Sequence, residues 1–161
     1  MTMDSLNEHL IPEGELMPLI RERLAAGQTV RYLPFRGVSM LPMLRQGKDA
    51  VEVGPVAGKL KKYDIPVYQY PSGKYVMHRI VGVKQDYYVC LGDNTYEYER
   101  IRPEQILAVV VAFRRGQKRI SVDSFGYQLY SRIWVAIYPF RKLLKRVAWR
   151  LRRLLRWGKE E

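Results

Sequence analysis

Residues 106–113 read Ile-Leu-Ala-Val-Val-Val-Ala-Phe, a continuous apolar run of strand length that is rich in β-branched side chains. Such a run predicts a strand that is buried on both faces. Shorter segments with alternating character precede it, and Gly- and Pro-containing turns separate them; we expect strands at 29–35, 50–53, 65–70, 74–83 and 87–91. The turn Pro71-Ser72-Gly73 predicts a hairpin between 65–70 and 74–83. Many short strands around one apolar run favour a mainly β core.

Helical patterns flank this core on both sides. Apolar side chains recur at helical spacing in residues 13–26, and Gly27 is a plausible end of that helix. Residues 114–126 are polar and are expected to form a connection, whereas 127–157 have a helical pattern. We therefore expect an N-terminal helical segment (1–27), a β domain (28–120) and a C-terminal basic tail (121–161).

The positive charge of the chain is concentrated at its C-terminal end. The sequence holds 28 Lys and Arg against 16 Asp and Glu, a net charge of +12, and residues 141–161 contain nine basic and only two acidic side chains. Residues 139–157 form an amphipathic helical pattern, with one apolar stripe: Phe140, Leu143, Leu144, Val147, Leu151, Leu154 and Leu155. This pattern is typical of a helix that lies on an anionic membrane surface. The alternative is a helix that packs its leucines on the β domain; a nucleic-acid partner is not expected.

Other features bear on the cellular setting. Cys90 is the only cysteine, so no intramolecular disulfide is possible, and we expect a buried strand thiol. The sequence has no apolar stretch of about 20 residues and no basic, apolar N-terminal leader. These patterns predict a cytoplasmic protein without a transmembrane helix or signal peptide, peripheral on the inner face of the cell membrane.

Three short segments carry candidate chemistry. The first is Gly37-Val38-Ser39-Met40-Leu41-Pro42, in which a loop serine follows a glycine. His78, in Met77-His78-Arg79-Ile80, is suited to act as a base near neutral pH, which a serine hydroxyl needs before it can attack. Gly92-Asp93-Asn94 closes the next predicted strand, and its aspartate is a candidate to orient a histidine.

The order and spacing of these segments resemble the type I signal peptidases, whose superfamily includes the LexA-like repressors. The resemblance covers roughly residues 28–113 and implies a signal-peptidase/LexA-like β-ribbon core. His78 stands where the bacterial branch has a lysine, as in the Ser-His-Asp branch of the endoplasmic reticulum and archaea. The chain departs from the family in Gly47-Lys48-Asp49, which carries one extra residue, and in lacking a second aspartate after Asn94, where Glu97 and Glu99 lie instead.

The resemblance implies a serine endopeptidase that works through an acyl-enzyme and needs neither a metal nor a cofactor. Ser39 is the expected nucleophile, His78 the general base, and Asp93 the first choice for the supporting acid, with Glu99 as the alternative. The Ser39 backbone N–H is the candidate oxyanion donor, and Gly37, Met40 and Pro42 are the candidate contacts for a peptide or protein precursor; Met40 has a packing role as its alternative. Two other functions remain open: a LexA-like self-cleaving regulator and a catalytically inactive binding module.

Overall fold

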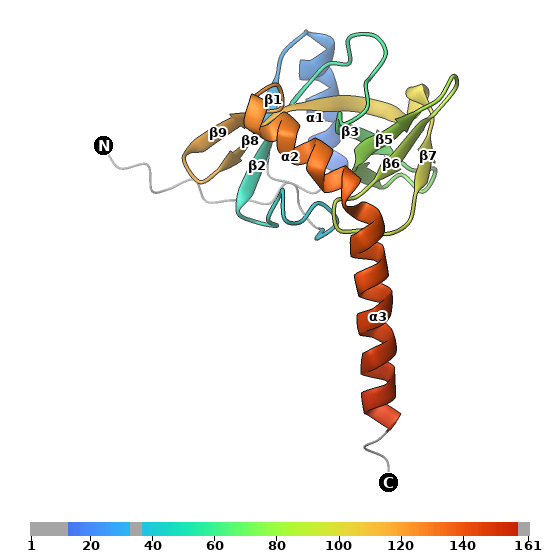
Figure 1. Cartoon of the computed structure of the whole chain (residues 1–161). Helices are drawn as coiled ribbons and strands as arrows, with labels where there is room; N and C mark the ends of the chain where they lie inside the picture. Colours follow the sequence, from blue (N-terminus) through green and yellow to red (C-terminus); the bar gives the residue numbers. More distant parts are fainter. Residues whose placement is uncertain (1–12, 33–36, 158–161) are drawn as a thin grey trace.

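The computed structural model describes residues 13–32 and 37–157. This part of the chain is mainly β, with two antiparallel sheets and three α-helices (Figure 1). The strands, in chain order, are β1 (Val30–Tyr32), β2 (Asp49–Gly54), β3 (Pro66–Gln69), β4 (Tyr75–Met77), β5 (Arg79–Val83), β6 (Tyr88–Leu91), β7 (Glu99–Ile101), β8 (Ile106–Arg115) and β9 (Lys118–Ser121). The helices are α1 (Glu13–Ala25), α2 (Phe125–Ala136) and α3 (Tyr138–Trp157), and a short 3-10 helix spans Pro103–Gln105.

Strand β8 organises the molecule. The larger sheet has the order β1-β2-β8-β3-β4, with β9 also paired to β8, and the smaller sheet has the order β5-β6-β7. Ala108, Val110 and Phe113 on β8 belong to one hydrophobic cluster, while Ile106 and Val109 pack against a second. The expected apolar strand is thus confirmed, and its side chains contribute to both parts of the core, which explains its uninterrupted apolar sequence.

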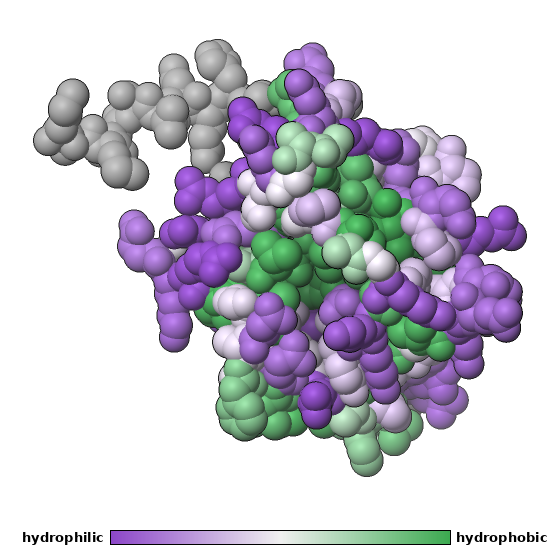
Figure 2. All heavy atoms as spheres, turned by 90° about the horizontal axis from the view of Figure 1, so that it is seen from above, coloured by the Kyte–Doolittle hydropathy of each residue, from purple (hydrophilic) through white to green (hydrophobic). Residues whose placement is uncertain are grey.

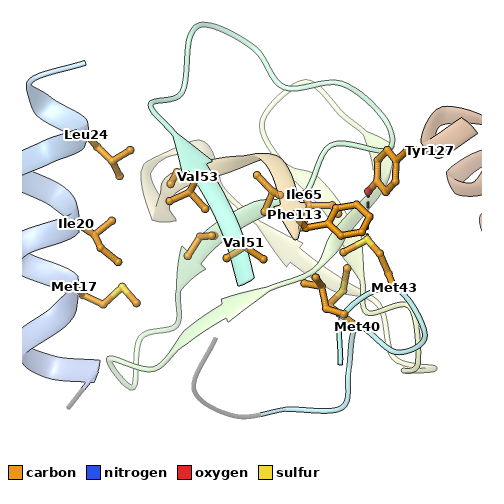
Figure 3. Packing of buried hydrophobic residues seen from close by; sticks show 14 residues of the cluster. Met17, Ile20, Leu24, Met40, Met43, Val51, Val53, Ile65, Phe113 and Tyr127 are labelled. Atoms are coloured by element: carbon orange, nitrogen blue, oxygen red, sulfur yellow. Dashed lines mark hydrogen bonds between the residues drawn. The ribbon is translucent and has the colours of Figure 1, made fainter. Parts of the chain in front are cut away.

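The first cluster is closed by α1 on one side and by the Ser39 loop on the other (Figure 3). Met17, Ile20 and Leu24 recur at helical spacing on α1 and point toward β2, whose Val51 and Val53 are completely buried (Figure 3). The predicted helix 13–26 is therefore confirmed, apart from its last residue. Burial of one such aliphatic side chain contributes about 1.5–3 kcal/mol to folding.

The expected single strand 74–83 is wrong. The structure divides it at His78 into β4, which pairs with β3 in the larger sheet, and β5, which pairs with β6 in the smaller sheet. The predicted hairpin therefore exists only as β3–β4. The sequence hides the break because apolar residues continue on both sides of it, although the hydrogen-bonding partner of the chain changes there.

The expected polar connection at 114–126 is also wrong. Strand β8 continues to Arg115, turns at Gly116 with φ 61°, and returns as β9. Arg114 and Arg119, on the two strands of this hairpin, donate to the carboxylate of Glu52 at 3.1 and 2.7 Å. The charged residues suggested a loop, but Arg114 and Arg119 are accommodated on strands because both pair with Glu52 of β2.

The last two helices are joined almost without interruption. Ile137 N–H donates to Ile133 O and Arg141 N–H donates to Ile137 O, so hydrogen bonding continues across the junction. Helix α2 lies against the body of the molecule, whereas α3 extends away from it (Figure 1). Figure 2 shows the molecule from above: hydrophobic side chains gather near the centre of this face and again along its lower edge, and hydrophilic ones surround much of the rest.

Three further expectations concern single features. Cys90 is buried in β6, as predicted, and burial raises the pKa of its thiol to about 12. Phe35 and the N-terminal residues 1–12 lie outside the described residues. Within 13–32 and 37–157, no helix has the length and apolar character needed to cross a bilayer.

Candidate active site

Ser39 lies in an irregular turn between β1 and β2. The turn starts at Gly37, whose φ of 131° suits glycine. A Cβ built on Gly37 would lie 4.0 Å from Ser39 Oγ, so this glycine is an immediate neighbour of the hydroxyl. Pro42, which follows a cis peptide bond, is exposed in the same loop. Met40 does not line an open cleft: it is 4% exposed and packs in the core, which is the alternative role that the sequence left for it.

The turn at Gly92–Asn94 holds the serine loop in place. Asn94 N–H donates to Ser39 O at 2.7 Å, and Asn94 Nδ2 donates to Val38 O at 3.1 Å. Gly92 allows this contact, because a Cβ at that position would lie only 2.8 Å from Ser39 O. Two of the three sequence motifs are therefore in direct contact, although they are far apart along the chain.

His78 occupies the junction between the two sheets and is 5% exposed. Its Nδ1 lies 3.0 Å from Glu99 Oε2 and 3.1 Å from Tyr68 Oη. Tyr68 also donates a hydrogen bond to Glu99, so imidazole, phenol and carboxylate form a closed triangle. The carboxylate that contacts the histidine is thus the second choice of the sequence, on β7, a strand that the sequence did not predict.

The charge state of Glu99 determines which ring nitrogen of His78 carries the proton. Burial raises the pKa of Glu99, but hydrogen bonds with His78, Tyr68 and Tyr70 outweigh burial and lower this pKa to about 2. At neutral pH the carboxylate is ionised and only accepts, so Nδ1 of a neutral His78 carries the proton. Nε2 then has its lone pair free, which is the state that a general base requires.

Asp93, the first choice for the supporting acid, is engaged elsewhere. Its two oxygens accept from Arg79 Nε at 2.8 Å and Arg79 Nη2 at 2.7 Å, and both side chains are buried. Burial lowers the pKa of Arg79, but the pair with Asp93 outweighs burial and raises it above its usual value. This bidentate pair satisfies the carboxylate within the core, so its role in the structure is to neutralise a buried guanidinium.

Arg79 connects the segments around the site. Besides Asp93, its guanidinium donates to Tyr127 Oη and Ser131 Oγ on α2, each at 2.9 Å, and contacts Met43 Sδ in the serine loop at 3.1 Å. One buried side chain next to His78 therefore ties together the serine loop, the Gly92–Asn94 turn and α2. Ser39 Oγ and His78 are not joined by a hydrogen bond among the described residues.

The sequence missed Tyr68 and Arg79 as parts of the site. Tyr68 lies in an apolar alternating strand, where a tyrosine is an ordinary core residue, and nothing in its spacing marks its hydroxyl. For Arg79 a signal existed: an arginine inside an apolar strand must have a buried partner. The described residues contain no cluster of His, Cys, Asp or Glu that could hold a metal ion.

Comparison of the chain with protein-family models and with curated proteins finds no match.

Proposed function

We propose that this protein is a serine endopeptidase with a signal-peptidase-like core, in which Ser39 attacks the peptide carbonyl and His78 removes its proton. The observation that carries the proposal is the 3.0 Å contact between His78 Nδ1 and ionised Glu99, which leaves Nε2 as a base. The seating of the serine loop on the Gly92–Asn94 turn supports it. Catalytic hydrogen bonds are often loose without substrate, so the reacting pair is expected to close when a peptide binds.

In the proposed reaction, Ser39 Oγ forms an ester with the acyl part of the substrate while its proton moves to His78 Nε2. The imidazolium, stabilised by Glu99, then gives that proton to the leaving amine. Water then hydrolyses the ester: His78 Nε2 removes a proton from the water and returns it to Ser39 Oγ as the acid product leaves. The backbone N–H of Ser39 makes no hydrogen bond to another described residue and is the proposed oxyanion donor.

The test is labelling and cleavage by matched variants. Ser39→Ala and His78→Ala should each abolish both cleavage of a peptide library and labelling by an acylating serine reagent. Ser72→Ala, at an exposed serine in the β3–β4 turn, is the matched control and should retain both. If the reagent labels Ser39→Ala and wild type equally, the nucleophile is misassigned; if wild type is neither labelled nor active on any peptide, an inactive binding module of the same fold explains the site better.

We further propose that the protein is held peripherally at the anionic, cytoplasmic face of a membrane by its C-terminal helices. Seven of the twelve large hydrophobic side chains that are exposed among the described residues lie on α2 and α3: Phe125, Leu129, Ile133, Phe140, Leu143, Leu144 and Val147, which are 46–83% exposed. The described part of the apolar stripe of α3 is therefore not packed on the β domain, contrary to the alternative left open above. An exposed stripe next to a one-signed basic face suits an anionic lipid surface.

Vesicle co-sedimentation tests this attachment. Wild type should bind vesicles that contain phosphatidylserine, and Leu143→Ser combined with Leu144→Ser should weaken binding by about tenfold or more, because two side chains lose their burial in the acyl region. Val83→Ser, at an exposed valine of the small sheet, is the control and should bind as wild type does. Equal binding by all three proteins would contradict the assignment of α3.

A further inference from the structure

A cavity of about 760 Å³ lies between α3 and the segment that leads from β6 to β7. Residues 94–97 and Glu99 form one wall, and the other is formed by four cationic side chains of α3: Lys142, Lys145, Arg146 and Arg150. Among the side chains that the structure describes, none of these four cations takes part in an ion pair. The cavity therefore presents four cations that lack an anionic partner within the described part of the protein.

Two of these cations are held in place by aromatic rings. Lys145 Nζ lies 4.1 Å from the centroid of the Tyr96 ring, and Lys142 Nζ lies 5.9 Å from that of Tyr138. The two rings stack on each other, and Tyr138 Oη donates to Tyr96 O at 3.0 Å. Cation–π contacts of this kind restrict a lysine that would otherwise sample many rotamers. The cationic wall is thus partly preorganised by the same segment that it faces.

The position of these lysines on α3 separates them from the proposed lipid-binding face. With 3.6 residues per turn, each residue advances by about 100°, which places Lys142 and Lys145 each about 150° from the centre of the stripe formed by Phe140, Leu143, Leu144 and Val147. When that stripe is immersed in lipid, both lysines point away from the bilayer. Their charge is therefore available to a ligand in the cavity.

The cavity also adjoins the proposed catalytic residues. Glu99, which contacts His78, forms part of its wall, and Asn94, at the other end of the same segment, holds the loop of Ser39. Asn94 therefore borders both the Ser39 loop and the cavity, so a peptide bound at Ser39 lies next to the segment that forms one wall of the cavity. The acidic side chains of the cavity cannot satisfy these cations, because Glu99 is already bonded to His78 and Tyr68 and only Glu97 remains.

From this arrangement we infer that the cavity is a substrate subsite that binds an acidic peptide segment, carrying Asp or Glu side chains, close to the scissile bond. The role of the cavity as a substrate subsite rests on the proposed peptidase function. Binding of an acidic peptide, however, does not require catalysis. The cations of α3 hold the acidic side chains by Coulomb attraction and hydrogen bonds. Substrates are selected by charge before the serine attacks.

The test is direct binding to the Ser39→Ala protein, so that failure of the proposed chemistry leaves it unaffected. The probes are two fluorescent peptides in the same Gly-Ser host, one with four Glu residues and the other with four Gln residues. We expect the Glu peptide to bind about tenfold or more tightly, since several partly exposed ion pairs of up to about 1 kcal/mol each act together. Lys142→Gln with Lys145→Gln should remove most of this preference.

A variant with the same change in net charge provides the control. Lys84→Gln with Lys118→Gln alters two exposed lysines outside the cavity and should keep the preference for the Glu peptide. Equal binding of the two peptides overturns the inference, as does an equal effect of the two double variants, which would indicate attraction to net charge alone. If Lys142→Gln with Lys145→Gln weakens binding to phosphatidylserine vesicles as much as to the peptide, the cavity serves lipid and the inference also fails.

Discussion

The buried pair of Arg79 and Asp93 offers the sharpest test of how the site is built. The side chain of Arg79 is fully buried and that of Asp93 is 2% exposed, so Asp93→Asn leaves a guanidinium in the core without its anionic partner. Removing one member of a buried ion pair costs about 3–5 kcal/mol. For a protein of this size each kcal/mol corresponds to about 2–4 °C in Tm, so we expect a decrease of about 6–20 °C.

Thermal and urea unfolding followed by circular dichroism measure this loss. Asp123→Asn, which changes an exposed aspartate, should shift Tm by less than about 2 °C, since surface substitutions usually stay within about 0.5 kcal/mol. The double variant Arg79→Met with Asp93→Leu should recover much of the stability that Asp93→Asn loses, because no unpaired charge remains in the core. An Asp93→Asn protein that unfolds like wild type but no longer cleaves peptide would refute the reasoning and make Asp93 the acid that supports catalysis.

Three further predictions concern the serine loop and the histidine. Tyr68→Phe removes the hydroxyl that bonds both the imidazole and Glu99 and should lower kcat about tenfold or more with KM little changed, measured in steady-state cleavage assays. Gly92→Ala places a Cβ 2.8 Å from Ser39 O, so the serine loop must move and kcat/KM should fall by about 10²-fold. Gly82→Ala is the control: the nearest atom to its Cβ is 3.4 Å away, and the substitution should be tolerated. The pKa of Glu99 is lowered from 4.5 to about 2 in the folded protein, so its contribution to stability is complete above about pH 4.5 and is lost as the pH falls toward 2; urea unfolding should show this loss in wild type but not in Glu99→Gln.

The part of the fold that follows from local patterns was predictable. The apolar run at 106–113 became the central strand β8, and helical spacing located α1 to within one residue. What could not be predicted was where strands change partners: residues 74–83 have a continuous strand pattern, yet they divide between two sheets at His78. Hydrogen-bond partners come from segments far along the chain, and the alternation of side chains in one segment carries no information about them.

In the candidate site, too, some features follow from the sequence and others only from the tertiary structure. The sequence determined the residue types and their order: a serine after a glycine, a histidine in a strand, an Asp in a Gly-Asp-Asn turn, and a helix with apolar and basic faces. The tertiary structure decided which carboxylate meets the imidazole, because it brings Glu99 on β7 to His78 and gives Asp93 to the guanidinium of Arg79. That choice depends on distances of a few ångströms between side chains from different strands, and such distances exist only after the sheets have packed around a buried charge that must be neutralised.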